Sequence, residues 1–283
     1  MKDYLDLTKP SITWLILMST AVGYFFGHGG SWDFAVLLHT LLGTGLLASG
    51  TAALNQWYER REDALMRRTQ HRPIPAGRIA PGRAFLFGAA LSVAGFLELY
   101  WGVNRLSAIL GLATLLSYLL LYTPLKRRSP ISTAVGAVPG AMPPLIGYAA
   151  ARGELTAEAW ALYAILFLWQ FPHFLAIAWM YRSDYARAGI RMLPVVEPDC
   201  RSTARQILWY SLLLIPASML PGFLAMTGKL YLAGAFLLSS LYFAAGWRAA
   251  IERTAARARQ VLLSSVFYLP LLYGLMVVDR PGL

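Results

Sequence analysis

Nine apolar windows recur along the 283-residue chain, each close to the length that crosses a lipid bilayer. The windows cover residues 11–27, 34–58, 84–102, 106–122, 132–150, 157–181, 206–226, 230–247 and 260–278. A run of about 20 apolar residues spans a bilayer as a helix, because a helix satisfies its own backbone hydrogen bonds in lipid. The sequence therefore predicts an all-α polytopic membrane protein with nine transmembrane helices, forming one domain over residues 1–283.

The basic residues test this count and predict an orientation. With nine spans, 21 of the 25 Lys and Arg residues lie on the same side as the amino terminus. The others are Arg105, Arg152, Lys229 and Arg280. Because Lys and Arg gather in cytoplasmic loops, we expect a cytoplasmic amino terminus and an external carboxy terminus, in a bacterial inner membrane. Topology explains the net charge of +11, so no nucleic-acid partner is expected.

The fifth window combines small residues with prolines. Pro139, Pro143 and Pro144 remove backbone donors, while Gly136 and Gly140 are spaced for close helix contact. Two interpretations remain open: a broken helix that lines a substrate cavity, or simple tight packing.

Oxygen-bearing side chains recur at a spacing of four where the second window ends. On one continuous helix, Asn55, Glu59 and Asp63 would form a ladder with steps of about 6 Å. Such oxygens suit Mg²⁺, which prefers hard ligands and substrate phosphates. The alternative is a helix end whose acids pair with Arg60, Arg61 and Arg67.

Basic residues beside these acids predict a diphosphate site. Arg68 and Arg72 follow directly in the chain, and the arginine fork suits phosphate oxygens. Lys126 and Arg182 are further candidates on the same predicted membrane side. Asp184 also lies on that side and could complete the Mg²⁺ ligands, or could simply pair with a neighbouring arginine.

Two polar residues interrupt the sixth window. Gln170 and His173 lie within an otherwise apolar span. The histidine could bind iron, relay a proton or form a hydrogen bond within the helix bundle, and the last is the simplest of the three. These residues are candidates for a haem-binding or cavity-lining role.

The acidic and basic motifs together resemble the UbiA superfamily of intramembrane prenyltransferases. Its pattern N-x-x-x-D-x-x-x-D, followed by R-T-x-x-R-P, is matched by Asn55, Glu59, Asp63, Arg68, Thr69, Arg72 and Pro73. Glu59 replaces the commoner aspartate, and Met180 and Ala188 stand where a second acidic motif often has a partner for Asp184. Further segments resemble the haem-farnesylating branch: residues 7–10, 71–78, 122–127, 140–147, 169–174 and 184–195.

The resemblance implies a nine-helix UbiA-like bundle that transfers farnesyl from farnesyl diphosphate to a vinyl group of haem B, with addition of water. It also implies Mg²⁺ as cofactor, held by Asn55, Glu59, Asp63 and Asp184, and diphosphate bound by Arg68, Arg72, Lys126 and Arg182. The product would pass to a haem-modifying or oxidase-assembly protein. Two alternatives remain open: another aromatic prenyl acceptor, and a secondary transporter that uses the carboxylates as ion sites.

Overall fold

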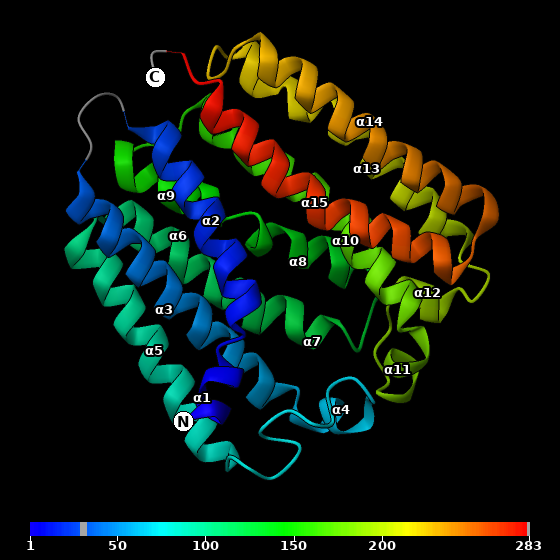
Figure 1. Cartoon of the computed structure of the whole chain (residues 1–283). Coiled ribbons are helices and arrows are strands. Elements are labelled where there is room, and N and C mark those ends of the chain that lie inside the picture. Colours follow the sequence, from blue (N-terminus) through cyan, green and yellow to red (C-terminus); the bar gives the residue numbers. More distant parts are fainter. Residues whose placement is uncertain (29–32, 282–283) are drawn as a thin grey trace. The chain divides into compact units, whose positions relative to one another are not determined.

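The computed structural model describes residues 1–28 and 33–281, and within them it contains helices and no strand (Figure 1). Nine helical segments of this described part are long and apolar enough to cross a membrane. They are α2 (Pro10–Gly27), α3 (Phe34–Tyr58), α5 (Pro81–Gly102), α6 to α7 (Arg105–Leu125), α8 to α9 (Ser132–Arg152), α10 (Ala157–Met180), α13 (Arg201–Phe223), α14 (Lys229–Glu252) and α15 (Ala255–Val278). The predicted all-α fold with nine membrane-spanning segments is confirmed.

Several helices begin where the sequence supplies a start signal. Pro10 and Pro81 stand at the first helical positions of α2 and α5, where a missing backbone donor costs nothing. Asp33 caps α3, and its Oδ1 accepts hydrogen bonds from the backbone N of Ala35 and Val36 at 3.0 Å. The apolar windows near 206–226 and 260–278 lie within longer helices, since α13 begins at Arg201 and α15 at Ala255, with first turns rich in arginine. Hydropathy detects the apolar span and not the whole helix.

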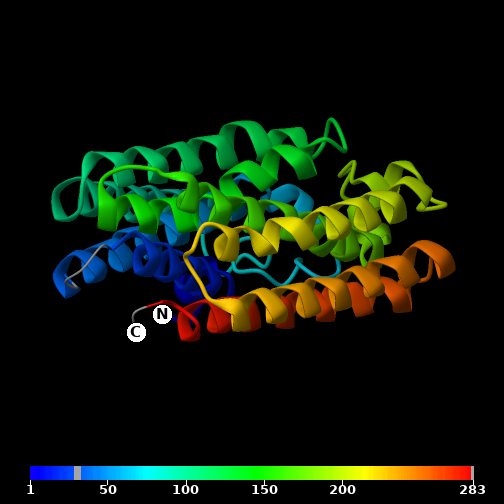
Figure 2. The same cartoon turned by 90° about the horizontal axis from the view of Figure 1, so that it is seen from above.

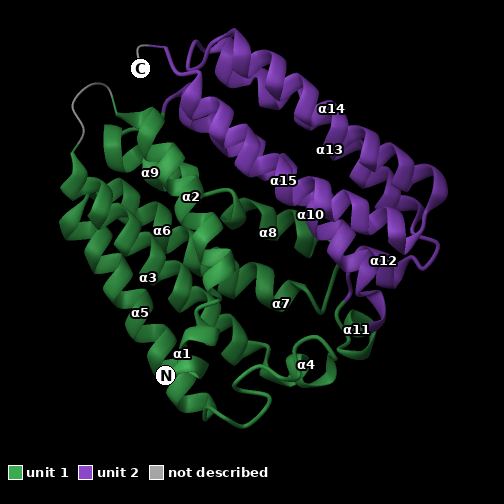
Figure 3. Ribbon diagram, viewed as in Figure 1, with its two compact units in different colours: residues 1–155, 184–190 green, residues 156–183, 191–283 purple. Residues whose placement is uncertain are grey.

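The chain divides into two compact units, coloured separately in Figure 3. Unit 1 comprises residues 1–155 and 184–190, and unit 2 comprises residues 156–183 and 191–283. In unit 2, α10 packs on α13, α13 on α14, α14 on α15, and α15 on α10, which makes a four-helix bundle. Figures 1 and 2 both show α14 and α15 running alongside each other. The expectation of one functional domain across both units stays a prediction.

Unit 1 is built on two close helix pairs, α3 with α5 and α2 with α9. The second pair depends on glycine. A Cβ at Gly147 would overlap the carbonyl oxygen of Thr20, and one at Gly23 would overlap that of Pro144. Small residues let two backbones approach closely, which is a common device of helix packing in membranes.

The fourth span changes pitch near its carboxyl-terminal end. Between α6 (Arg105–Leu116) and α7 (Thr123–Leu125), residues Ser117–Tyr122 form a π-helical turn. The Thr123 hydroxyl donates to the carbonyl oxygen of Tyr118 at 2.8 Å, on the face of this turn. Such turns insert extra backbone into a helix and often accompany functional sites.

The fifth span is broken, as one of the two interpretations predicted. Two residues separate the end of α8 (Ser132–Gly140) from the start of α9 (Pro143–Arg152). Tight packing is present as well, since a Cβ at Gly136 would lie 2.6 Å from the ring of Tyr122. The two interpretations are therefore compatible, and a cavity-lining role for this span stays a prediction.

Candidate functional site

The predicted oxygen ladder lies at the end of α3, and its helix is interrupted. Helix α3 ends at Tyr58, Glu59 forms the junction with φ −87° and ψ 11°, and α4 (Arg60–Leu65) follows. The expectation of a single continuous helix is therefore wrong. The fourfold spacing survives in the backbone, because N of Glu59 donates to O of Asn55 and N of Asp63 donates to O of Glu59. All three side chains are buried.

Lys126 and Glu59 form a nearly buried ion pair within unit 1. Their Nζ and Oε1 atoms lie 2.8 Å apart, and each side chain is 12% exposed. Burial alone would raise the pKa of Glu59, but the charges of Lys126 and Lys9 and the bonds from Lys126 and Asn55 outweigh it, so this pKa lies below its ordinary value. Burial would likewise lower the pKa of Lys126, but Glu59 holds it well above its ordinary value. The pair is therefore ionised.

Asn55 connects this ion pair to two other elements. Its Nδ2 donates to Glu59 Oε2 at 3.0 Å and to Thr123 Oγ1 at 3.3 Å. Thr123 is the residue that follows the π-helical turn. Thr123 and Lys126, which follow the pitch change in the fourth span, therefore both contact residues at the end of α3.

Asp63 is the most deeply buried of the candidate ligands, with an exposed fraction of 0%. Arg72 Nη1 lies 2.7 Å from its Oδ2. Its other oxygen, Oδ1, is buried and has no hydrogen-bond partner among the described residues. Burial raises the pKa of Asp63 above its ordinary value, and Arg72 opposes that effect.

Lys9 belongs to this cluster, although the sequence reasoning did not select it as a site residue. It joins α1 (Lys2–Leu7) to α2 in a left-handed conformation, with φ 49° and ψ 65°. Its Nζ donates to Asn55 Oδ1 at 3.3 Å. Burial, followed by the charges of Arg72 and Lys126, lowers the pKa of Lys9 to about 7. The available signal in the sequence is a lysine that stands directly before a helix-starting proline and an apolar span. The charge distribution explains such a lysine by membrane topology alone, so it does not indicate a site residue.

Asp184 lies against the loop that follows α4. In α11 (Arg182–Arg187) its Oδ2 accepts a hydrogen bond from the backbone N of Arg68 at 3.2 Å, and its Oδ1 pairs with Arg187. The Arg68 side chain donates from Nη2 to the Tyr185 hydroxyl at 3.1 Å. The pairing with Arg187 that remained open from the sequence is thus present. The bond from Arg68 also joins Asp184 to the loop that follows Asp63 in the chain.

Three other sequence candidates lie in unit 2. Arg182 Nη1 donates to the carbonyl oxygen of Pro198 at 3.0 Å. Gln170 is buried and its Nε2 donates to O of Leu166 at 3.0 Å, within α10. His173 lies on α10 as well, with its Nδ1 2.7 Å from the hydroxyl oxygen of Ser265.

The oxygen atoms of the acidic cluster are suitable ligands for Mg²⁺, but Lys126 and Arg72 pair with its two carboxylates. The described ranges, 1–28 and 33–281, contain no group of three or more His, Cys, Asp and Glu side chains arranged to hold a metal. Asn55, Glu59 and Asp63 nevertheless offer hard oxygen donors, and the buried Oδ1 of Asp63 lacks a partner among the described residues. A buried polar atom of this kind calls for an ion or water.

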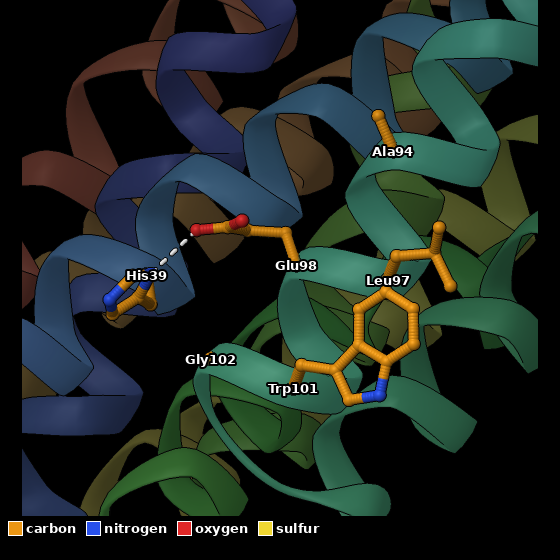
Figure 4. A pocket seen from close by; sticks show the side chains of 6 residues that line it. All are labelled: His39, Ala94, Leu97, Glu98, Trp101 and Gly102. Carbon is orange, nitrogen blue, oxygen red and sulfur yellow. Dashed lines mark hydrogen bonds and ion pairs between the residues drawn. The ribbon is translucent and has the colours of Figure 1, made fainter.

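A pocket of about 490 Å³ lies away from this cluster, at the other end of α3 (Figure 4). His39 Nδ1 and Glu98 Oε1 lie 2.6 Å apart at its rim, and Trp101 and Gly102 contribute to its lining. Along a helix, His39 and Asn55 are separated by about 24 Å. The pocket contains none of the candidate residues.

Comparison with known proteins identifies the family. The sequence model of the UbiA prenyltransferase family matches residues 16–271. The chain is 64% identical to a protein named protoheme IX farnesyltransferase from Solibacter usitatus, with all of both chains aligned. It is 47% identical to another of that name from Koribacter versatilis, over 99% of this chain and 94% of that one.

Solved structures show the same fold at low sequence identity. One, described as digeranylgeranylglyceryl phosphate synthase in membranes, superposes with a TM-score of 0.83 at 18% identity, over 100% of this chain and 99% of that chain. A UbiA homolog from Archaeoglobus fulgidus bound to GPP and Mg²⁺ gives a TM-score of 0.68 at 16% identity, over 97% and 99%. The predicted UbiA-like fold is confirmed. The chain is an integral membrane protein and belongs to the UbiA prenyltransferase family.

Proposed function

We propose that this chain transfers farnesyl from farnesyl diphosphate to a vinyl group of haem B, with addition of water, as a protohaem IX farnesyltransferase that makes haem O. Two relatives of that name are 64% and 47% identical to this chain over 99% or more of its length. The observation that carries the proposal is the paired cluster at the end of α3, where Lys126 holds Glu59 and Arg72 holds Asp63. We also propose that residues 1–283 act as one domain.

The cluster supplies both halves of a metal–diphosphate site. When bound, Mg²⁺ would be held by Asn55, Glu59, Asp63 and Asp184, and would stabilise negative charge on the leaving diphosphate. Lys126 and Arg72, freed from their acids, would turn their donors to phosphate oxygens, and Arg68 and Arg182 are additional candidates. An exchange of partners of this kind keeps every buried charge compensated before and after substrate binds.

The proposed reaction requires ionisation of farnesyl diphosphate and an environment that keeps water away from the allylic cation. The bond between farnesyl C1 and the diphosphate oxygen breaks, and the electron pair leaves with the diphosphate. The vinyl π electrons of haem attack C1 and form a carbon–carbon bond, after which water adds to the resulting cation and loses a proton. The basic residues stabilise charge on the leaving group, while the surrounding helices exclude water from the allylic cation.

The proposed setting is a bacterial inner membrane with the amino terminus in the cytoplasm. The support is the gathering of 21 of 25 Lys and Arg residues on that side. Farnesyl diphosphate, haem B and the lipid bilayer are the expected partners. A haem-modifying or oxidase-assembly protein would receive the product.

One assay tests the function and its metal. The purified protein is incubated with haem B, farnesyl diphosphate and Mg²⁺, and the haem is identified by mass. We expect haem O, its loss in excess EDTA, its return with added Mg²⁺, and little product from Asp63→Asn. Full turnover in EDTA would contradict the metal site. Product from an aromatic acid but not from haem B would contradict the proposed acceptor.

A further inference from the structure

His173 lies in α10 and is fixed by two residues of unit 2. Its Nδ1 lies 2.7 Å from the hydroxyl oxygen of Ser265 on α15. Its ring stacks on that of Trp169, with centroids 4.8 Å apart and planes 23° from parallel. Trp169 is held in turn, because its Nε1 donates to the carbonyl oxygen of Ser265 at 2.9 Å. One residue of α15 therefore fixes both the ring and the surface on which it rests.

The contacts of Ser265 determine which ring nitrogen carries the proton. Its hydroxyl donates to the carbonyl oxygen of Leu262 at 2.6 Å, and a carbonyl can only accept. With its single proton engaged there, we assign Ser265 Oγ as the acceptor of a hydrogen bond from the N–H at Nδ1 of His173. In a neutral imidazole the other nitrogen, Nε2, then keeps its lone pair.

This lone pair has no partner among residues 1–28 and 33–281. The contacts of His173 in that part of the chain are the bond at Nδ1 and ring contacts with Trp169 and Phe174. The side chain is neither fully buried nor exposed, so a ligand could reach it. A polar group inside a membrane span is costly unless it is satisfied, and it commonly serves substrate binding or transport.

We propose that Nε2 of His173 binds the iron of the haem acceptor, with Ser265 as the positioning residue. This inference rests on the proposed function, which supplies the haem. Imidazole is a common axial ligand of haem iron, and a ligating histidine usually donates its other N–H to a fixed acceptor. That bond orients the ring and raises the basicity of the ligating nitrogen. Attachment through iron leaves the vinyl groups, at the porphyrin edge, free to react.

The test is spectroscopic and uses the full chain in lipid nanodiscs. Haem B is titrated into the wild type, His173→Gly, Ser265→Ala and His39→Gln, and iron coordination is followed by absorption, resonance Raman and electron paramagnetic resonance. The His39 variant is the matched control, since His39 lies in unit 1 with Glu98 as its partner. We expect a histidine-ligated spectrum in the wild type and in the control.

His173→Gly should lose the iron–histidine signature and regain an imidazole-ligated spectrum when free imidazole is added, which requires a folded pocket. Ser265→Ala should leave His173 bound to the iron but weaken haem binding by about tenfold. That is the lower end of the loss expected when the hydrogen-bond partner of a ligating histidine is removed. If His173→Gly cannot be purified, His173→Met, of similar bulk, should show the same loss of signature. A histidine-ligated spectrum that persists without His173, or unchanged haem affinity in Ser265→Ala, would overturn the proposal.

Mass analysis of the same samples separates this inference from the proposed function. Haem O production with a spectrum independent of His173 would overturn iron ligation and leave the function standing. A spectrum that depends on His173, with no farnesylated product, would overturn the function and support haem binding alone.

Discussion

Replacing Arg72 with methionine would leave the carboxylate of Asp63 buried without its partner. The two side chains lie 2.7 Å apart, with exposed fractions of 27% for Arg72 and 1% for Asp63. Removing one member of a buried pair typically costs about 3–5 kcal/mol of unfolding free energy. Because Arg72 is partly exposed, we expect a loss near the lower end, about 3 kcal/mol.

The size of this loss depends on the buried charge, which two further variants isolate. Adding Asp63→Asn to Arg72→Met removes the unpaired charge and should recover about 1–3 kcal/mol, the usual range of coupling between residues in contact. Arg127→Met is the matched control, because Arg127 pairs with Glu62 at 3.0 Å and its side chain is 64% exposed, against 12% for that of Glu62. Solvent around the exposed guanidinium screens this pair, so we expect a loss of about 0–1 kcal/mol.

Equilibrium unfolding in detergent micelles, followed by helical circular dichroism, gives the unfolding free energies of five proteins under one set of conditions. They are the wild type, Arg72→Met, Asp63→Asn, the double variant and Arg127→Met. The measurement uses differences between variants, so it does not depend on the absolute stability in micelles. If Arg72→Met costs no more than Arg127→Met, the pair contributes little to stability. If the double variant loses as much unfolding free energy as Arg72→Met and Asp63→Asn together, the unpaired carboxylate of Asp63 is not the cause of the loss.

Three other perturbations test the remaining features of unit 1. Glu59→Asp should retain much of the turnover while Glu59→Gln loses far more, because the amide lacks the charge that favours Mg²⁺. Turnover of both variants is measured at limiting and at saturating Mg²⁺. Equal, near-wild-type rates for both would show that Glu59 does not hold the metal. Because Lys9 Nζ lies in the same cluster, bonded to Asn55, we expect it to contact the bound diphosphate as well. Lys9→Met should then raise the KM for farnesyl diphosphate by about tenfold, as expected for the loss of a charged hydrogen bond, whereas Lys2→Met should not. An unchanged KM would exclude this contact. Gly147→Ala should lower the unfolding free energy by about 1–3 kcal/mol through overpacking. Gly82→Ala is the control and should not lower it, because a Cβ at Gly82 would meet nothing within 4 Å. Equal stability of the two variants would contradict the close contact of α2 with α9.

The fold was predictable from local sequence because membrane spans are encoded locally. Each apolar run satisfies its own backbone, so no knowledge of distant contacts is needed to place it. The prediction was wrong at Glu59, where a continuous helix was expected. The backbone turns there between α3 and α4, and the side chain meets Lys126, 67 residues away in the sequence. A contact of that range is set by the tertiary fold and leaves no periodic pattern around residue 59.

The candidate site was predictable in its acids and less so in its cations. The spacing of Asn55 and Asp63 is visible in the sequence, and both side chains are buried beside basic groups. Lys9 was not selected, because a lysine before a membrane span is ordinarily explained by topology. Its role in the cluster depends on a left-handed backbone and on a contact with Asn55, 46 residues away. Neither feature can be deduced from the charge alone.

The π-helical turn at Ser117–Tyr122 gives the fourth span a tolerance to the loss of one residue. Removing one residue there, for example Leu120, would allow an ordinary α-helical pitch. Because the π turn accommodates one extra residue, the following residues would keep nearly the same positions, and Lys126 would still meet Glu59. The same residues wound at α-helical pitch without the deletion would instead rotate the following ones by about 100° and shift them by about 1.5 Å. Homologous sequences aligned with a one-residue gap in this segment should therefore keep a cation opposite Glu59, whereas a gap on either side of it should not.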